Sequence, residues 1–126
     1  MVKGRNNAMV ATVVLVVVGL LVLRCEMVQA EIYVVGGASG WTYGVQTWPY
    51  LKKFRAGDTL AFNYSPKEHN VVYVTEKEYD NCNPSYNSEV YDSGKDKITI
   101  KEGNNYFISG LKNQCAAGLK LAVYAD

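Results

Sequence analysis

Residues 106–124, YFISGLKNQCAAGLKLAVY, contain two predicted strands and the loop that joins them. The first strand is the aromatic and β-branched run 106–108, and the second is 119–123, where large apolar residues alternate with Lys120 and Ala122. Three residues that favour turns predict a tight loop between them: Gly110, Asn113 and Gly118. Cys115 lies in this loop, and a cysteine held between two strands is suited to bind a metal or to act as a reactive thiol.

Short β-forming runs recur upstream of this stretch, with turn residues between them. The predicted strands are 32–35, 60–64, 71–74, 90–91 and 98–101. Thr75 is placed to cap a short helix over 75–80, and the segment 40–50, which holds both tryptophans, is predicted to be an irregular crossing. These elements predict an all-β domain, an antiparallel sandwich or barrel with one or two short helices.

The first 30 residues have the layout of a secretory signal peptide. Lys3 and Arg5 give a positive start, 8–23 is an almost unbroken apolar run, and Ala30 is a small residue of the kind that precedes cleavage. A signal anchor that stays in the membrane is the alternative, but the run is short for a span, which needs about 18 to 20 residues. We therefore predict a cleaved signal peptide over 1–30 and one domain over 31–126.

Cleavage leaves a domain that is close to neutral. The whole chain has a formal charge of +1, and residues 1–30 contain three bases and one acid, so residues 31–126 have a formal charge of −1. This balance argues against an electrostatic nucleic-acid binder. No apolar tail follows at the C-terminus, so we expect no membrane attachment after cleavage.

Cysteine usage agrees with an extracellular location. Cys25 leaves with the signal peptide, and Cys82 and Cys115 remain as an even pair in an oxidising compartment. A disulfide is favoured over two free thiols, and closing a loop of about 34 residues would contribute roughly 3.5 to 4 kcal/mol in the chain-entropy model. Asn63 begins a glycosylation sequon, Asn63-Tyr64-Ser65, although the following Pro66 usually hinders the transferase.

Several short motifs together resemble the phytocyanins, the plant branch of the cupredoxins, and most closely the plantacyanin or basic blue group. The matching stretches are 33–37, 40–42, 48–49, 54–58, 62–64, 69–72, 91–94 and 106–108. They cover essentially all of 31–126, and the lack of a Pro/Ser-rich extension also resembles plantacyanins. The resemblance implies a cupredoxin-like Greek-key β-sandwich with a disulfide that matches Cys82–Cys115.

The resemblance also implies one copper ion held by two His, one Cys and a weak axial Met or Gln, for transfer of single electrons. On the matching motifs His69 stands at the first His position and Ser109 at the Cys position. Gln114 stands at the second His position and Leu119 at the axial position. Three of the four donors are therefore missing from the matched positions.

These replacements are not conservative, because a blue copper site depends on a thiolate in a His₂Cys plane. A serine hydroxyl does not ionise near neutral pH, Gln114 has an amide in place of an imidazole, and Leu119 has no donor atom. Cys115 could supply a thiolate only if Cys82 were left unpaired, which is the less favoured alternative. We expect no cofactor, although copper is the cofactor of the family.

Two functions follow from the resemblance. The favoured one is a secreted, copper-free binding or structural protein, comparable to early nodulin-like members that have also lost copper ligands. Its partner would be an unidentified extracellular protein or cell-wall component, bound near His69 and 111–114, and we expect a monomer. The alternative is a copper-dependent electron carrier. An enzyme is disfavoured, because the mature chain has one His and lacks a Ser-centred motif or paired acids.

Overall fold

The computed structural model describes residues 13–16 and 29–126 of the chain. Most of the predicted signal peptide, with Cys25, lies outside the described residues, so its cleavage stays a prediction. Among the helices that are described, none is long and apolar enough to cross a membrane.

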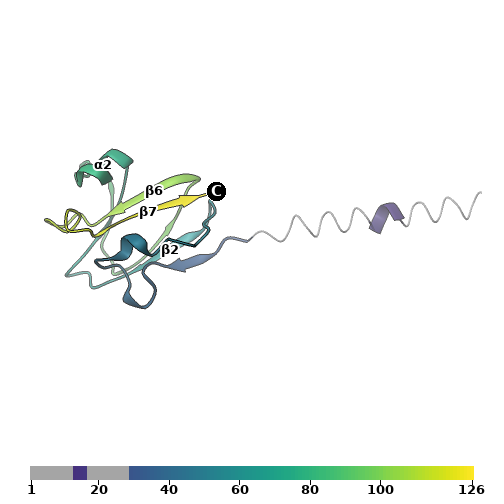
Figure 1. Ribbon diagram of the computed structural model, residues 1–126, viewed down its shortest axis with the longest axis horizontal. Coiled ribbons are helices and arrows are strands. Elements are labelled where there is room, and N and C mark those ends of the chain that lie inside the picture. Colours follow the sequence, from purple (N-terminus) through teal and green to yellow (C-terminus); the bar gives the residue numbers. More distant parts are fainter. Residues whose placement is uncertain (1–12, 17–28) are drawn as a thin grey trace, which may run out of the picture.

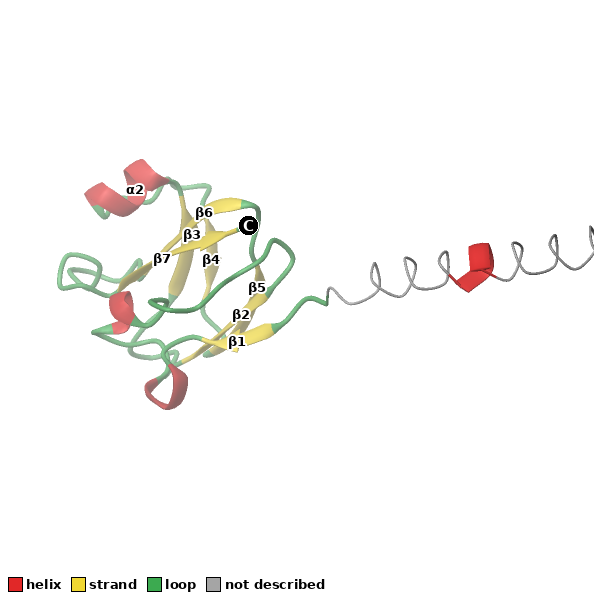
Figure 2. Ribbon diagram, turned by 45° about the vertical axis from the view of Figure 1, so that its right-hand side comes forward, coloured by secondary structure: helices red, strands yellow, loops and turns green. Residues whose placement is uncertain are grey.

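Two sheets form the domain (Figures 1 and 2). The three-stranded sheet has the order β1 (Ile32–Val34), β2 (Thr59–Asn63) and β5 (Lys95–Thr99). The four-stranded sheet has the order β4 (Glu89–Tyr91), β3 (Val71–Val74), β6 (Gly103–Ile108) and β7 (Lys120–Ala125). The predicted all-β sandwich is therefore confirmed.

The prediction that all strands run antiparallel was wrong for one pair. β1 lies parallel to β2, with Tyr33 opposite Leu60, while the other strand pairs are antiparallel. Parallel neighbours require a long connection, and residues 35–58 provide it. Apolar alternation marks a strand but not its direction, so the sequence did not reveal the parallel pairing.

Strand boundaries also moved where a polar residue faces the interior. β5 begins at Lys95, which was predicted as a turn, because Asp96 points inward and interrupts the apolar alternation. The Asp96 carboxylate accepts hydrogen bonds from the Tyr64 hydroxyl and from Ser93. Burial, followed by the hydrogen bond to Asp96, raises the pKa of Tyr64 above its usual range. A satisfied carboxylate can therefore occupy an interior strand position.

The connection between β1 and β2 is more regular than predicted. It contains two short 3₁₀ helices, η1 (Gly37–Ser39) and η2 (Val45–Thr47). Trp41 lies between them, buried, and its ring packs edge-on against Phe62 with 5.2 Å between centroids. Trp41 thus covers one end of the core.

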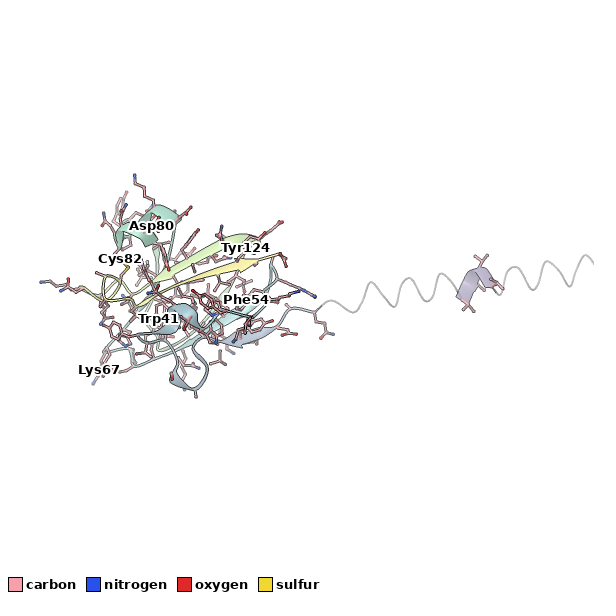
Figure 3. The ribbon with its side chains drawn as sticks, in the orientation of Figure 1. Trp41, Phe54, Lys67, Asp80, Cys82 and Tyr124 are labelled. Carbon is pink, nitrogen blue, oxygen red and sulfur yellow. A yellow bond between two sulfur atoms is a disulfide. The ribbon has the colours of Figure 1, made fainter. Side chains whose placement is uncertain are left out.

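The predicted helix is α2 (Glu76–Asn81), and its cap is confirmed. The Thr75 hydroxyl accepts a hydrogen bond from the Glu78 backbone N–H at 3.3 Å. Cys82 follows in a left-handed conformation, and its sulfur bonds to Cys115. Figure 3 shows Cys82 at the end of α2. The disulfide is confirmed, and the alternative of two free thiols is wrong.

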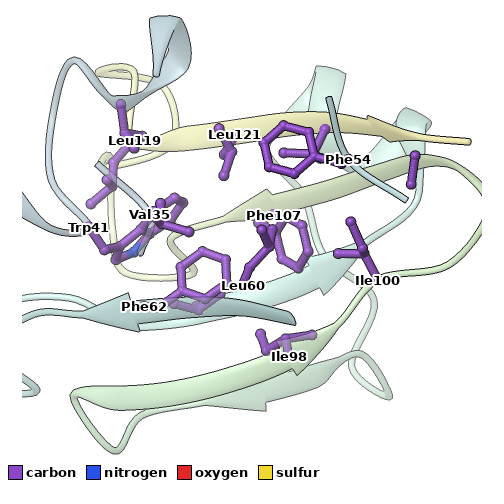
Figure 4. Packing of buried hydrophobic residues seen from close by; sticks show 14 residues of the cluster. Val35, Trp41, Phe54, Leu60, Phe62, Ile98, Ile100, Phe107, Leu119 and Leu121 are labelled. Carbon is purple, nitrogen blue, oxygen red and sulfur yellow. The ribbon is translucent and has the colours of Figure 1, made fainter. Parts of the chain in front are cut away.

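The core fills the space between the sheets (Figure 4). Phe62 of the smaller sheet meets Phe107 of the larger one, with ring centroids 5.1 Å apart. Leu119, the residue before β7, is fully buried in the same cluster. The core therefore reaches to the end of the sandwich where the loop 109–119 begins.

Candidate functional site

Strand register brings the four matched positions to one end of the sandwich. His69 precedes β3 and Ser109 follows β6, and these antiparallel neighbours pair Val72 with Ile108. Leu119 precedes β7, which pairs Lys120 with the same Ile108. In Figure 1 the loop before β7 lies at the opposite end of the domain from the C-terminus.

Gln114 is the centre of a polar cluster at this end. Its Oε1 atom accepts hydrogen bonds from His69 Nδ1 at 3.0 Å and from the Ser109 hydroxyl at 2.7 Å. Its Nε2 atom donates to the Glu68 carbonyl at 2.7 Å, which fixes the orientation of the amide. Since the amide oxygen can only accept, Nδ1 of His69 carries the proton.

Two of the three side chains in this cluster are buried. Ser109 is 1% exposed and His69 is 9% exposed. In the described part of the chain, every buried side-chain nitrogen or oxygen has a hydrogen-bond partner. His69 Nδ1 and the Ser109 hydroxyl therefore find their hydrogen-bond acceptor within the protein, at Gln114.

Leu119 does not share these hydrogen bonds. It is 0% exposed and packs within the apolar cluster that also contains Trp41. The next residue back, Gly118, accepts a hydrogen bond from Gln46 Nε2 at 3.0 Å, which holds the loop against η2. Of the four matched positions, the structure joins three by hydrogen bonds and places the fourth in the core.

Two residues at this end were not singled out from the sequence. Asn70 accepts a hydrogen bond from the Gly110 backbone N–H at 2.6 Å through its side chain, and from Trp41 Nε1 at 2.9 Å through its carbonyl. Tyr43 stands edge-on to His69, with ring centroids 5.8 Å apart. The partners are far apart in sequence, so no local pattern predicts these contacts.

The structure bears on the two ways in which this chain could hold a metal: through a Cys115 thiolate, or through another cluster of ligands. Cys115 is bonded to Cys82, so the alternative in which Cys115 supplies a free thiolate is wrong. Over 13–16 and 29–126, no three His, Cys, Asp or Glu residues gather as metal ligands would. Asn63 is exposed at the end of β2, and its glycosylation stays a prediction.

A cavity of about 560 Å³ lies elsewhere, between β4, β5 and the loop after α2. It is lined by residues such as Tyr73, Glu78, Lys97 and Lys101, and by none of the four matched positions. The Glu78 carboxylate there is already bonded to Ser85 and Ser88. We therefore place the candidate site at the end of the domain that contains His69, because the four matched positions lie there.

Comparison with known proteins agrees with this geometry. The family described as Plastocyanin-like domain matches residues 41–119. The chain is 46% identical over 125 residues to a chemocyanin of Lilium longiflorum, across 99% of both chains. It is 44% identical over 128 residues to a basic blue protein of Arabidopsis thaliana, again across 99% of both chains. The chain belongs to the phytocyanin family.

Solved structures place this phytocyanin in the cupredoxin-like fold. Cucumber basic protein, a blue copper protein, superposes with a TM-score of 0.73 at 46% identity, over 75% of this chain and 99% of that chain. Cucumber stellacyanin gives a TM-score of 0.68 at 29% identity, over 79% and 99%. The family and the fold implied by the sequence motifs are both confirmed.

Proposed function

We propose that this phytocyanin is a copper-free binding protein that works outside the cell. The observation that carries the proposal is that one atom, Gln114 Oε1, accepts hydrogen bonds from both His69 and Ser109. Groups at three positions that would hold copper in ligand-complete relatives bond to one another. To bind a metal, the chain would have to break this buried cluster, at a cost of about 1 to 3 kcal/mol for each polar group left unpaired.

The donor set does not fit a blue copper centre. That centre requires a thiolate and two imidazoles in one plane, with a weak axial ligand. The four matched positions offer one imidazole, one hydroxyl and one amide, while the Leu119 side chain is hydrocarbon. A single imidazole does not define a metal site.

The alternative function is single-electron transfer through copper. The printed names of relatives, such as the basic blue protein, favour it. It requires a copper centre, and the chemistry of Ser109, Gln114 and Leu119 argues against one. We also propose that the protein is not an enzyme, because among the described residues the Ser109 hydroxyl donates to Gln114 and is not hydrogen-bonded to the His69 imidazole, as an activated nucleophile would be.

A surface for a partner lies above the polar cluster. Tyr43 is 48% exposed and stands edge-on to His69, and Leu111 is 38% exposed. The exposed Lys67 and Lys112 are close in sequence to His69 and Leu111, respectively. Figure 3 labels Lys67 at this end of the domain. We call Tyr43, Lys67, Leu111 and Lys112 the loop-end surface. Its apolar and basic groups suit an extracellular protein that offers an apolar contact flanked by acids.

Metal analysis tests the proposal directly. The protein is secreted from the full-length chain, purified without chelators and analysed for copper and for visible absorption. We expect a colourless protein that takes up no stoichiometric copper when Cu²⁺ is added. An intense thiolate-to-copper band, or one tightly bound copper per chain, would contradict the proposal and favour electron transfer.

Partner capture tests the surface. Tagged wild-type protein and the variant Tyr43→Ser/Leu111→Ser are incubated with extracellular extract, and the captured proteins are quantified. The control is Tyr86→Ser/Val90→Ser, because Tyr86 and Val90 are exposed, lie at and before β4, and do not belong to the loop-end surface. We expect loss of specific partners with the first variant alone. Unchanged capture would exclude the loop-end surface.

A further inference from the structure

A buried carboxylate lies at the end of the domain opposite the polar cluster. Asp58 is 2% exposed, and it stands just before β2. Its Oδ2 atom accepts a hydrogen bond from the Arg55 backbone N–H at 2.8 Å, within a turn closed by Asp58 N–H and the Arg55 carbonyl. Its Oδ1 atom accepts from the Glu31 backbone N–H at 2.9 Å. Both of these partners are neutral amides, although a buried carboxylate gains more from a cationic partner.

Glu31 is held firmly in this position. While its N–H donates to Asp58, its carbonyl accepts from the Thr59 N–H at 2.8 Å, at the start of the β1–β2 ladder. Ala30, the preceding residue, is exposed and outside the strand. The peptide bond between Ala30 and Glu31 is the predicted cleavage point, so the nitrogen bound to Asp58 is the one that cleavage would free.

We propose that Asp58 is the binding site for the α-ammonium group that signal-peptide cleavage creates at Glu31. A peptidase adds water across the Ala30–Glu31 bond: Ala30 keeps the new carboxylate, and the Glu31 nitrogen becomes an amine that takes a proton. The neutral hydrogen bond to Asp58 Oδ1 then becomes an ion pair across the same two atoms. Cleavage thereby fixes β1 onto β2 more strongly than the uncleaved chain can. The proposal is independent of copper binding and of any partner.

The charges around this nitrogen allow the ion pair. A hollow of about 140 Å³ beside it is lined by Gln29, Glu31, Tyr33, Lys53, Arg55 and Asp58. Glu31 and Asp58 are negative there, and Lys53 and Arg55 are positive, so the hollow is neutral before cleavage. The ammonium would be in hydrogen-bond contact with Asp58, and direct contact outweighs repulsion from more distant, hydrated cations. Because Glu31 is exposed, the remaining N–H groups of the ammonium can reach water.

The ion pair has a defined pH signature. A carboxylate partner raises the pKa of an α-amino group above its usual value of about 7.7 to 8.0. A group whose pKa is raised on folding contributes stability that is complete below the unfolded pKa and is lost as pH rises through the folded pKa. The extra stability should therefore be present at about pH 6.5 and absent well above the raised pKa.

The Tyr33 phenol also titrates at alkaline pH, so its contribution to the pH dependence of stability must be separated from that of the α-ammonium group. Burial, and then the neighbouring Glu31 carboxylate, raise the pKa of Tyr33 above its ordinary value. The variant Tyr33→Phe removes this phenol but leaves Asp58 and the Glu31 nitrogen in place. Each comparison is therefore made twice, once with Tyr33 intact and once with the Tyr33→Phe substitution present in every chain.

The experiment compares two versions of the N-terminus on the secreted protein. One is wild type; the other has one alanine inserted between Ala30 and Glu31, which moves the charged end away from Asp58. Intact mass first establishes where each chain starts, and urea unfolding is then measured from pH 6.5 to 11. We expect the unfolding equilibrium constant of wild type to be about tenfold lower at pH 6.5, since one pKa unit is a tenfold change, and the two constants to converge at high pH.

Asp58→Asn is then introduced into both proteins. It should remove the difference between their unfolding constants, because the ammonium loses its carboxylate partner. If Asp58→Asn does not fold, the insertion comparison still decides the question, since it leaves Asp58 intact. A wild-type protein that starts at a residue other than Glu31 overturns the proposal. Equal unfolding constants for the two chain ends at pH 6.5 also overturn it.

Discussion

The two ends of the sandwich bury polar groups in different ways. At the loop end, His69 Nδ1 and the Ser109 hydroxyl both donate hydrogen bonds to the Gln114 amide oxygen. At the opposite end, Asp58 is a charged group held by backbone N–H groups. The polar groups at the first end bond to one another, whereas we propose that Asp58 at the second end gains a charge partner if the chain is cleaved before Glu31. The two proposals therefore concern different ends: a metal site without its donors at the first, and a contact that depends on processing at the second.

The disulfide belongs to the loop end and should give the largest effect. Cys115 is adjacent to Gln114, so replacing both cysteines, Cys82→Ser/Cys115→Ser, should destabilise the protein by about 2 to 5 kcal/mol in urea unfolding. Hydrogen exchange should rise first in 109–119 and least around Glu31 and Asp58. The control Cys25→Ser should leave the secreted protein unchanged, because we predict that residue 25 is removed. Equal loss of protection from hydrogen exchange at both ends would show that the disulfide does not act mainly on the loop end.

Leu119 connects the core to the loop end. Leu119→Ala should cost about 2 to 5 kcal/mol, because the side chain is fully buried in the main cluster. Leu119→Met nearly conserves volume and should cost less than about 1.5 kcal/mol. Thermal or urea unfolding of the two variants checks this. If both variants cost the same, the position is not packed as described.

Gln114→Leu tests whether the polar cluster is held by its central amide. The change leaves Ser109 and His69 without their shared acceptor, so we expect a loss of about 1 to 3 kcal/mol. Gln46→Leu is the matched control, since Gln46 is exposed and donates one bond to Gly118; it should cost less than about 0.5 kcal/mol. Equal effects of the two changes would show that the cluster adds no stability.

His69→Gln should give the smallest effect. If the imidazole has only a packing and hydrogen-bonding role, a second amide can replace it at a cost of about 1 kcal/mol or less. Partner capture by this variant should match that by wild type. Complete loss of capture by a folded variant would instead make His69 part of a working site.

Many of the helices and strands were predictable from the sequence, because the residues that determine them are close together in the chain. Thr75 capped the predicted helix, and alternation in 119–123 marked β7. The parallel pairing of β1, the inward Asp96 and the Asn70 contacts depend on partners distant in sequence, which no local pattern encodes. At the candidate site, the motifs named His69, Ser109, Gln114 and Leu119. They could not show that Gln114 would accept bonds from two of the other three.

We propose that missing donor chemistry, and not a changed fold, separates the loop end from a copper centre. The most direct measurement is the visible spectrum, with added Cu²⁺, of wild type beside Ser109→Cys/Gln114→His/Leu119→Met, after disulfide mapping establishes that Cys82 still pairs with Cys115. We predict a colourless wild type and a blue triple variant with one copper per chain, while Leu119→Met alone stays colourless. A blue wild type, or a correctly paired triple variant that binds no copper, would contradict the account.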